Sequence, residues 1–109
     1  MVIDYDTGGT VGEYLARAQE YGVQILGYCA SACTAYLGAP DVCVSPDATL
    51  IFHEARNHDG TPNMLGTMLL AEQYPHRIAA WVREHGGLTA RLLTMTGREA
   101  IALGVMACK

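Results

Sequence analysis

Ser31 is the residue whose setting in this chain most suggests a nucleophile. It follows the apolar segment 23–28, which we expect to be a short strand, and it stands between Ala30 and Ala32 at the start of an alanine-rich helix. A turn from strand to helix holds a serine hydroxyl exposed at the end of a sheet, and small neighbours let a substrate reach it. The unpaired N–H groups that begin the helix point toward a developing oxyanion. The alternative, favoured by this segment alone, is a serine that only caps the helix.

His53 is the candidate for the base that such a serine needs. It closes the apolar segment 49–52, where a buried strand gives way to a polar loop. An imidazole at a strand end is well placed to take a proton from a hydroxyl at a neighbouring strand end. By itself it is more often a structural histidine than a base. We expect the remaining histidines only to meet solvent: His58, His76 and His85.

Gly8 and Gly9 form a third candidate element, between an expected strand over 2–6 and a helix. Without a Cβ atom, the backbone of such a pair can approach a ligand closely. The pair is too short for a dinucleotide-binding fingerprint and lacks the lysine of a phosphate loop. Many turns carry two glycines, so this pair alone is a weak signal.

The cysteines do not show the spacing of a metal site. Cys29 and Cys33 lie four residues apart beside scattered histidines, so no zinc site is predicted. One helical turn would bring this pair within disulfide distance, and it could then protect or gate Ser31 by redox chemistry. We nevertheless expect all four cysteines, including Cys43 and Cys108, to be small buried hydrophobic side chains.

Expected strands and helices alternate along the chain, which predicts an α/β fold with parallel strands. Apolar residues at helical spacing predict a helix over 10–21, ended by Gly22. The later predicted elements are a small-residue helix through Leu37, strands over 42–44 and 49–53, a helical stretch over 63–85 that Pro75 kinks or splits, a helix over 88–95 and a last short helix ending at Gly104.

Two further segments have competing interpretations. Met64, Leu65, Met68 and Leu69 could line a peptide groove, but their helical spacing favours a core or a subunit contact. The loop 56–61 could form the rim of a substrate channel, but we expect a solvated connection.

Composition and charge narrow the class of protein. The chain has 109 residues, enough for one domain, and half of them are hydrophobic. Charged residues are 17%, which argues against disorder. A net charge of −4 leaves no basic stripe for nucleic acid. No apolar run approaches the roughly 18 residues of a membrane helix, and no signal segment opens the chain.

The order of these elements is more specific than any of them. This order resembles that of the Clp-type serine peptidases and of the wider Clp/crotonase superfamily. It runs from a strand through Gly-Gly, a helix, a strand, a small-Ser-small segment, a helix and a strand to a last strand that ends in His. The matching segments are 4–54 and 94–104, and the tail 95–104 is similar to the family's S/T-x-x-E-A-x-x-x-G helix. The resemblance implies repeated β-β-α units in a mostly parallel sheet flanked by helices, in one domain over 1–109 that is truncated at its N-terminus.

The resemblance also implies roles for individual residues. Ser31 would be the nucleophile and His53, after a Pro-x-Ala turn, the general base. The backbone N–H groups of Gly9 and Ala32 would form the oxyanion hole. No metal or organic cofactor is implied. The implied partners are a peptide or protein substrate and further copies of this chain, because the superfamily builds trimers and stacked rings; a partner ATPase stays unidentified.

The chain departs from the family's pattern at the third member of the triad. The family has an Asp a few residues before the closing helix, whereas residues 91–94 here contain no acid. Glu54 follows His53 but would point to the opposite face of a continuing strand. Asp59 and Glu84 could fold back, although nothing in their spacing shows it. The triad acid is therefore unknown.

We expect a serine hydrolase, and more specifically a peptidase. The competing hypothesis is a non-catalytic assembly or binding module that keeps the fold without the full site. A crotonase-type acyl-thioester enzyme is disfavoured, because such enzymes need neither Ser31 nor His53. The first residues already read as a strand, so we expect a fragment or a domain completed by another subunit. As it stands the chain would be cytoplasmic, whereas a removed leader would make it exported.

Overall fold

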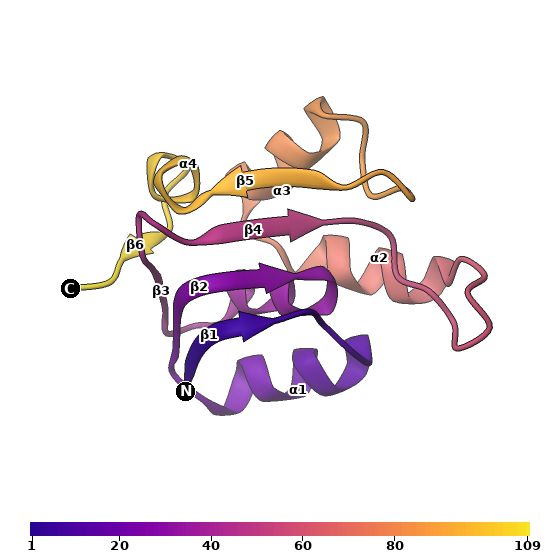
Figure 1. Ribbon diagram of the computed structural model, residues 1–109, viewed down its shortest axis with the longest axis horizontal. Helices are drawn as coiled ribbons and strands as arrows, with labels where there is room; N and C mark the ends of the chain where they lie inside the picture. The colour runs from indigo at the N-terminus through magenta and orange to yellow at the C-terminus, as the bar shows by residue number, and fades with distance from the viewer.

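A mixed β-sheet forms the centre of the computed structural model, which describes all residues 1–109 (Figure 1). Its strands are β1 Val2–Asp6, β2 Val23–Ala30, β3 Val42–Val44, β4 Thr49–Phe52, β5 Leu93–Thr96 and β6 Met106–Ala107. They lie in the order β5-β4-β2-β3-β6, and β1 pairs with β2. All pairings are parallel except that of β4 with β5. The chain is an α/β domain, as predicted.

The helices cover one face of this sheet. They are α1 Val11–Glu20, the 3₁₀ helix η1 Ser31–Gly38, α2 Met64–Gln73, α3 His76–Glu84 and α4 Gly97–Ala102. In β2, Val23 and Ile25 are buried, whereas Gln24 and Leu26 on the other face are exposed. The alternation places the hydrophobic core between the sheet and α1, η1, α2 and α3. Pro75 separates α2 from α3, which confirms the predicted break.

The helix predicted over 88–95 is wrong, because residues 93–96 form β5. Leu93 and Met95 are buried while Thr94 and Thr96 are exposed, which is the two-residue period of a strand. The strand pairs antiparallel with β4, so the sheet is mixed and not entirely parallel. The short helix that follows is confirmed: the Thr96 hydroxyl caps α4 by accepting a hydrogen bond from the Glu99 N–H, and the Glu99 carboxylate accepts one from the Thr96 N–H.

All four cysteines form disulfides, so the prediction of unpaired cysteines is wrong. Cys29 bonds to Cys33 with a Cα–Cα distance of 5.4 Å. Cys43 bonds to Cys108 over 65 residues of sequence, with a Cα–Cα distance of 4.8 Å. The second pair meets because β6 adds to β3 as a parallel edge strand, a contact between distant segments that no local pattern announces. The predicted burial is correct for Cys29 and Cys33, which are completely buried.

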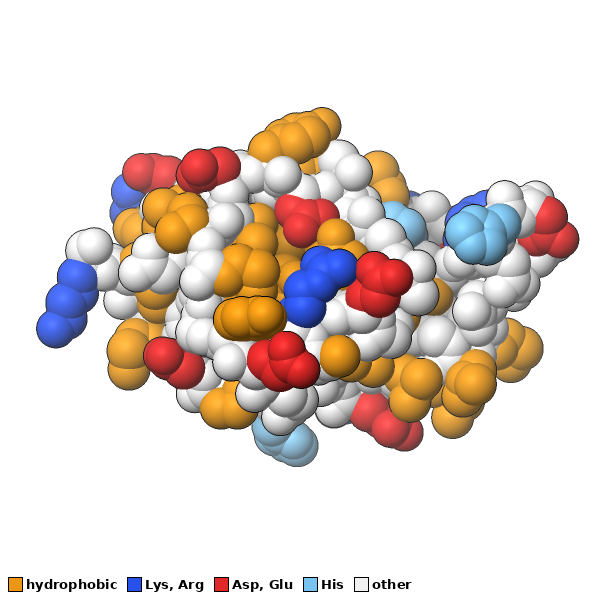
Figure 2. Space-filling model, turned by 90° about the horizontal axis from the view of Figure 1, so that it is seen from below, with side chains coloured by type: hydrophobic (Ala, Val, Ile, Leu, Met, Phe, Trp, Pro, Cys, Tyr) orange, Lys and Arg blue, Asp and Glu red, His pale blue; other side chains and the backbone are white.

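Four apolar side chains of α2 lie outside the core. Met64, Leu65, Met68 and Leu69 are between 40% and 79% exposed, so of the two expected roles the core is wrong and the subunit contact stays a prediction. Figure 2 shows apolar side chains gathered at the lower right of the view, where α2 lies. Only Gly66 and Leu70 of this helix are buried. Elsewhere on this face, charges of both signs are interspersed with apolar side chains (Figure 2). No helix of the chain has the length and apolar character needed to cross a membrane.

We predict that the Cys43–Cys108 disulfide is the larger covalent contributor to stability. A crosslink lowers the entropy of the unfolded chain more when it closes a longer loop. The double variant Cys43→Ala/Cys108→Ala should therefore lose about 4 kcal/mol of unfolding free energy, and Cys29→Ala/Cys33→Ala about 2 kcal/mol. Urea unfolding of both variants beside the wild-type protein measures the two losses. A larger loss for the Cys29/Cys33 variant would contradict the prediction.

Candidate active site

Ser31, His53 and Gly9 line one cavity of about 550 Å³ at the end of the sheet. The structure thus brings together three of the four residues singled out in the sequence. The fourth, Ala32, follows Ser31 in η1, is buried and does not line the cavity. The opposite wall comes from the loop after β4 and from α2, through Arg56, Asn57, His58, Asn63, Leu65 and Leu69. The loop 56–61 therefore forms part of a cavity rim, and His58, expected only to meet solvent, lines the cavity.

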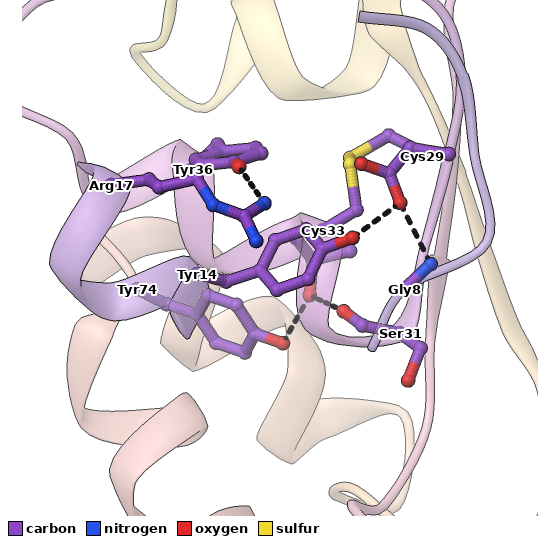
Figure 3. The surroundings of a disulfide bond; sticks show 10 residues. Gly8, Tyr14, Arg17, Cys29, Ser31, Cys33, Tyr36 and Tyr74 are labelled. Carbon is purple, nitrogen blue, oxygen red and sulfur yellow. Dashed lines mark hydrogen bonds between the residues drawn. A yellow bond between two sulfur atoms is a disulfide. The ribbon is translucent and has the colours of Figure 1, made fainter. Parts of the chain in front are cut away.

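Ser31 is the one non-glycine residue with a left-handed backbone, with φ of 60°. This conformation is disfavoured for residues with a Cβ atom, and it occurs where surrounding structure imposes it. Ala30 before it is extended and ends β2, so the chain turns sharply at Ser31 into η1. The Ser31 hydroxyl makes no hydrogen bond within the protein, and it points away from the neighbouring networks (Figure 3). The turn presents a free hydroxyl, and the side chain does not act as a helix cap.

Gly8 makes room for this turn. A Cβ atom on Gly8 would lie 2.8 Å from the Ser31 Cβ and 2.9 Å from the Ala30 carbonyl oxygen. The same position would lie 3.1 Å from the backbone nitrogen of Ala32, and Gly8 has φ of 96°. Only glycine fits both this close approach and this backbone conformation.

Asp6 holds the glycine turn by hydrogen bonds. Its Oδ1 atom accepts hydrogen bonds from the Gly8 N–H at 2.8 Å and from the Tyr14 hydroxyl at 2.7 Å (Figure 3). Burial and the bond to Asp6 raise the pKa of Tyr14 to about 12. The Gly9 N–H next to this clamp has no partner in the protein and remains free to bind an acceptor in the cavity. The sequence analysis missed Asp6, although an Asp two residues before a glycine is typical of an Asx turn.

The backbone carbonyl of Glu54 orients His53. The Nδ1 atom of His53 lies 2.6 Å from this carbonyl oxygen, which can only accept a hydrogen bond. Nδ1 therefore carries the proton, and in the neutral ring Nε2 is left as the acceptor. This is the tautomer that a general base needs, and in serine proteases a carboxylate fixes it. Here a main-chain dipole takes that place.

No carboxylate hydrogen-bonds to His53, so none of the candidate acids takes the place of the expected triad acid. Glu54 turns away and pairs with Arg56 at 3.3 Å. Asp59 accepts two hydrogen bonds from Thr61, which lower the pKa of its carboxyl group. The Glu84 side chain forms no ion pair, and the two ion pairs of the chain join other residues. The two acids that could have folded back, Asp59 and Glu84, therefore do not serve the imidazole.

A buried chain of hydroxyl groups holds the Ser31 carbonyl. Thr34 donates from Oγ1 to this carbonyl oxygen at 2.7 Å, so it accepts its other bond from the Tyr74 hydroxyl, also at 2.7 Å (Figure 3). Thr34 is completely buried, and Tyr74 is 6% exposed. The chain connects the end of α2 with the first residue of η1. Sequence reasoning missed both residues, because they are distant in sequence and neither stands in a recognisable motif.

Comparison with known protein families finds none that matches this chain, and comparison with curated proteins finds no relative. No group of three or more His, Cys, Asp or Glu side chains is arranged to hold a metal ion.

We predict that Gly8→Ala destabilises the fold by more than backbone strain alone. Left-handed backbone at a residue with a Cβ costs about 1–2 kcal/mol, and the new methyl group would also press on Ser31. Gly87→Ala is the matched control, because Gly87 has φ of 79° and open space around it. Urea unfolding should show a clearly larger loss of stability for Gly8→Ala. Equal losses would show that the turn yields without resistance.

We predict that Tyr74 makes the protein less stable at alkaline pH. Burial raises the pKa of Tyr74 well above 10.0 in the folded protein. Above pH 10 the unfolded chain therefore releases this proton while the folded protein keeps it, and stability falls as pH rises, by roughly 1.4 kcal/mol per pH unit at most.

Tyr74→Phe should flatten this alkaline slope, whereas Tyr5→Phe should leave it unchanged, because Tyr5 is 75% exposed. Urea unfolding at a series of pH values from neutral upward measures the slope for each protein. An unchanged slope in Tyr74→Phe would contradict the assignment.

Proposed function

We propose that the chain is a serine hydrolase with a Clp/crotonase-like fold and that it cleaves peptide bonds. One observation carries the proposal: a strained serine with a free hydroxyl shares a cavity with a histidine whose Nδ1 is already bonded to a carbonyl. Left-handed backbone at a non-glycine residue is concentrated at functional sites. A structural serine that only capped a helix would need neither the strain nor the cavity.

The proposed reaction is acyl transfer to water. Nε2 of His53 takes the proton of the Ser31 hydroxyl as Oγ attacks the substrate carbonyl carbon. The N–H groups of Gly9 and Ala32 stabilise the negative oxygen that forms. His53 then gives the proton to the leaving amine, and water hydrolyses the acyl-enzyme by the same steps in reverse order. The acid that would stabilise the charged imidazole is absent, so we expect slow turnover compared with a complete triad.

The substrate side of the proposal rests on the cavity wall. Leu65 and Leu69 line the cavity and are continuous with the exposed Met64 and Met68 of α2. Such a surface suits an extended peptide with apolar side chains, because methionine and leucine adapt to varied partners. It also supports the expectation that copies of this chain associate, since exposed apolar patches mark contact surfaces.

The test is covalent labelling of Ser31 by a fluorophosphonate, followed by intact mass and peptide mapping. We expect one label per chain on Ser31, none in Ser31→Ala, and labelling slowed about 10²- to 10⁴-fold in His53→Ala. Ser45→Ala and His76→Ala are the controls, because Ser45 is the only other serine and His76 lies exposed outside the cavity. A folded wild-type protein that takes no label would overturn the hydrolase and favour the binding module.

A further inference from the structure

We propose that the Cys29–Cys33 disulfide is a positioning element for the nucleophile: it closes a covalent ring around Ser31 and holds the left-handed turn that presents the hydroxyl to the cavity. The inference deepens the proposed function and rests on it for the role of Ser31. The role of the disulfide in the conformation of the turn can be tested separately.

The ring consists of five residues and includes both sides of the turn. Cys29 belongs to β2, and Cys33 belongs to η1. Ala30 and Ser31 between them make the change from extended to left-handed backbone. Figure 3 shows the disulfide beside Ser31. Both cysteines are completely buried, so the crosslink anchors the turn in the core while Ser31 stays partly exposed.

The non-covalent contacts of the turn restrain it incompletely. Thr34 binds the Ser31 carbonyl, and Gly8 packs against the Ser31 Cβ. Neither contact links the strand to the helix across Ser31. A serine released from the ring can rotate toward the right-handed region, which is favoured for residues with a Cβ atom. The hydroxyl would then leave its position in the cavity that it shares with His53, and small misplacements of reacting groups slow reactions by large factors.

The second disulfide provides an internal comparison. Cys29–Cys33 spans a sequence separation of 4 and Cys43–Cys108 one of 65. The short ring restricts the unfolded chain much less than the long one, so its contribution to overall stability is the smaller. Neither disulfide lines the cavity, but the short ring of Cys29–Cys33 encloses Ser31, which does. The two crosslinks should therefore have different main effects. Cys29–Cys33 should act on the geometry of the site, and Cys43–Cys108 on the stability of the fold.

The proposal makes the site dependent on oxidation. Forming the disulfide removes two electrons and two protons from the Cys29 and Cys33 thiols. A donor disulfide accepts them by thiol–disulfide exchange and is released as two thiols. A chain whose thiols stay reduced would fold with Ser31 outside its active position.

The test compares Cys29→Ala/Cys33→Ala with Cys43→Ala/Cys108→Ala in the full chain. The first variant should lower the maximal rate of Ser31 labelling by a fluorophosphonate about 100-fold, with little change in the concentration of half-saturation. The second variant should label at the wild-type rate although its urea midpoint falls further. Equal labelling rates in the first variant and the wild-type protein would overturn the proposal while leaving the hydrolase intact.

A readout independent of reactivity is the three-bond coupling between the amide and α protons of Ser31, which reports φ. Isotope-labelled wild-type protein should show the left-handed value, and the Cys29→Ala/Cys33→Ala variant a shifted one. If the wild-type protein takes no label, the proposed function fails and this coupling still decides the role of the disulfide. Should that variant not fold, Cys29→Val/Cys33→Ala restores apolar volume in the core. Failure of both to fold would make the disulfide a stability element and overturn the proposal.

Discussion

The left-handed turn at Ser31 is the constraint on which the candidate site depends. It stands at the end of β2, the strand that pairs with β1, β3 and β4, so the position of the serine is set by the centre of the sheet. A turn of this kind is unfavourable by itself and persists only where its surroundings determine it. Three elements contact or enclose the turn here: Gly8, the Thr34–Tyr74 hydroxyl chain and the Cys29–Cys33 disulfide. If Ser31 is the nucleophile proposed above, these elements hold it in place before a substrate binds.

The second feature of the site is a histidine oriented by a dipole instead of a charge. The Glu54 carbonyl fixes the tautomer of His53 as a carboxylate would, because both are hydrogen-bond acceptors. It stabilises a positively charged ring less, because a carbonyl has only a partial negative charge. A triad acid both orients the imidazole and compensates its positive charge. The Glu54 carbonyl orients the imidazole of His53 but compensates its charge more weakly. This weaker compensation is the physical reason to expect a reactive serine with modest turnover.

The two sides of the cavity differ in how many contacts hold their residues in place. The glycine turn is clamped by Asp6, whose carboxylate bonds to both Gly8 and Tyr14. The facing wall consists of exposed residues of the loop after β4 and the apolar side of α2. Gly9 and Ser31 therefore lie on the side of the cavity that the Asp6 hydrogen bonds and the core hold in place, and the exposed side chains lie on the other. Such a division is typical of sites in which a rigid scaffold carries binding loops.

The sequence by itself determined the α/β class, the helix of residues 11–20, the break at Pro75 and the association of Gly9, Ser31 and His53 with strand ends. These follow from local patterns: apolar periodicity, glycine and proline positions, and small residues around a serine. Only the tertiary structure decided that residues 93–96 pair with β4, that Cys43 meets Cys108, and that Asp6, Tyr74 and a backbone carbonyl support the site. The sequence does not show which residues meet in these contacts. The paired residues come together only when the chain folds, and every residue has a backbone carbonyl, so its presence at Glu54 predicts nothing. The type of a side chain predicts which interactions it can make, and the packing of the chain decides which neighbour it makes them with.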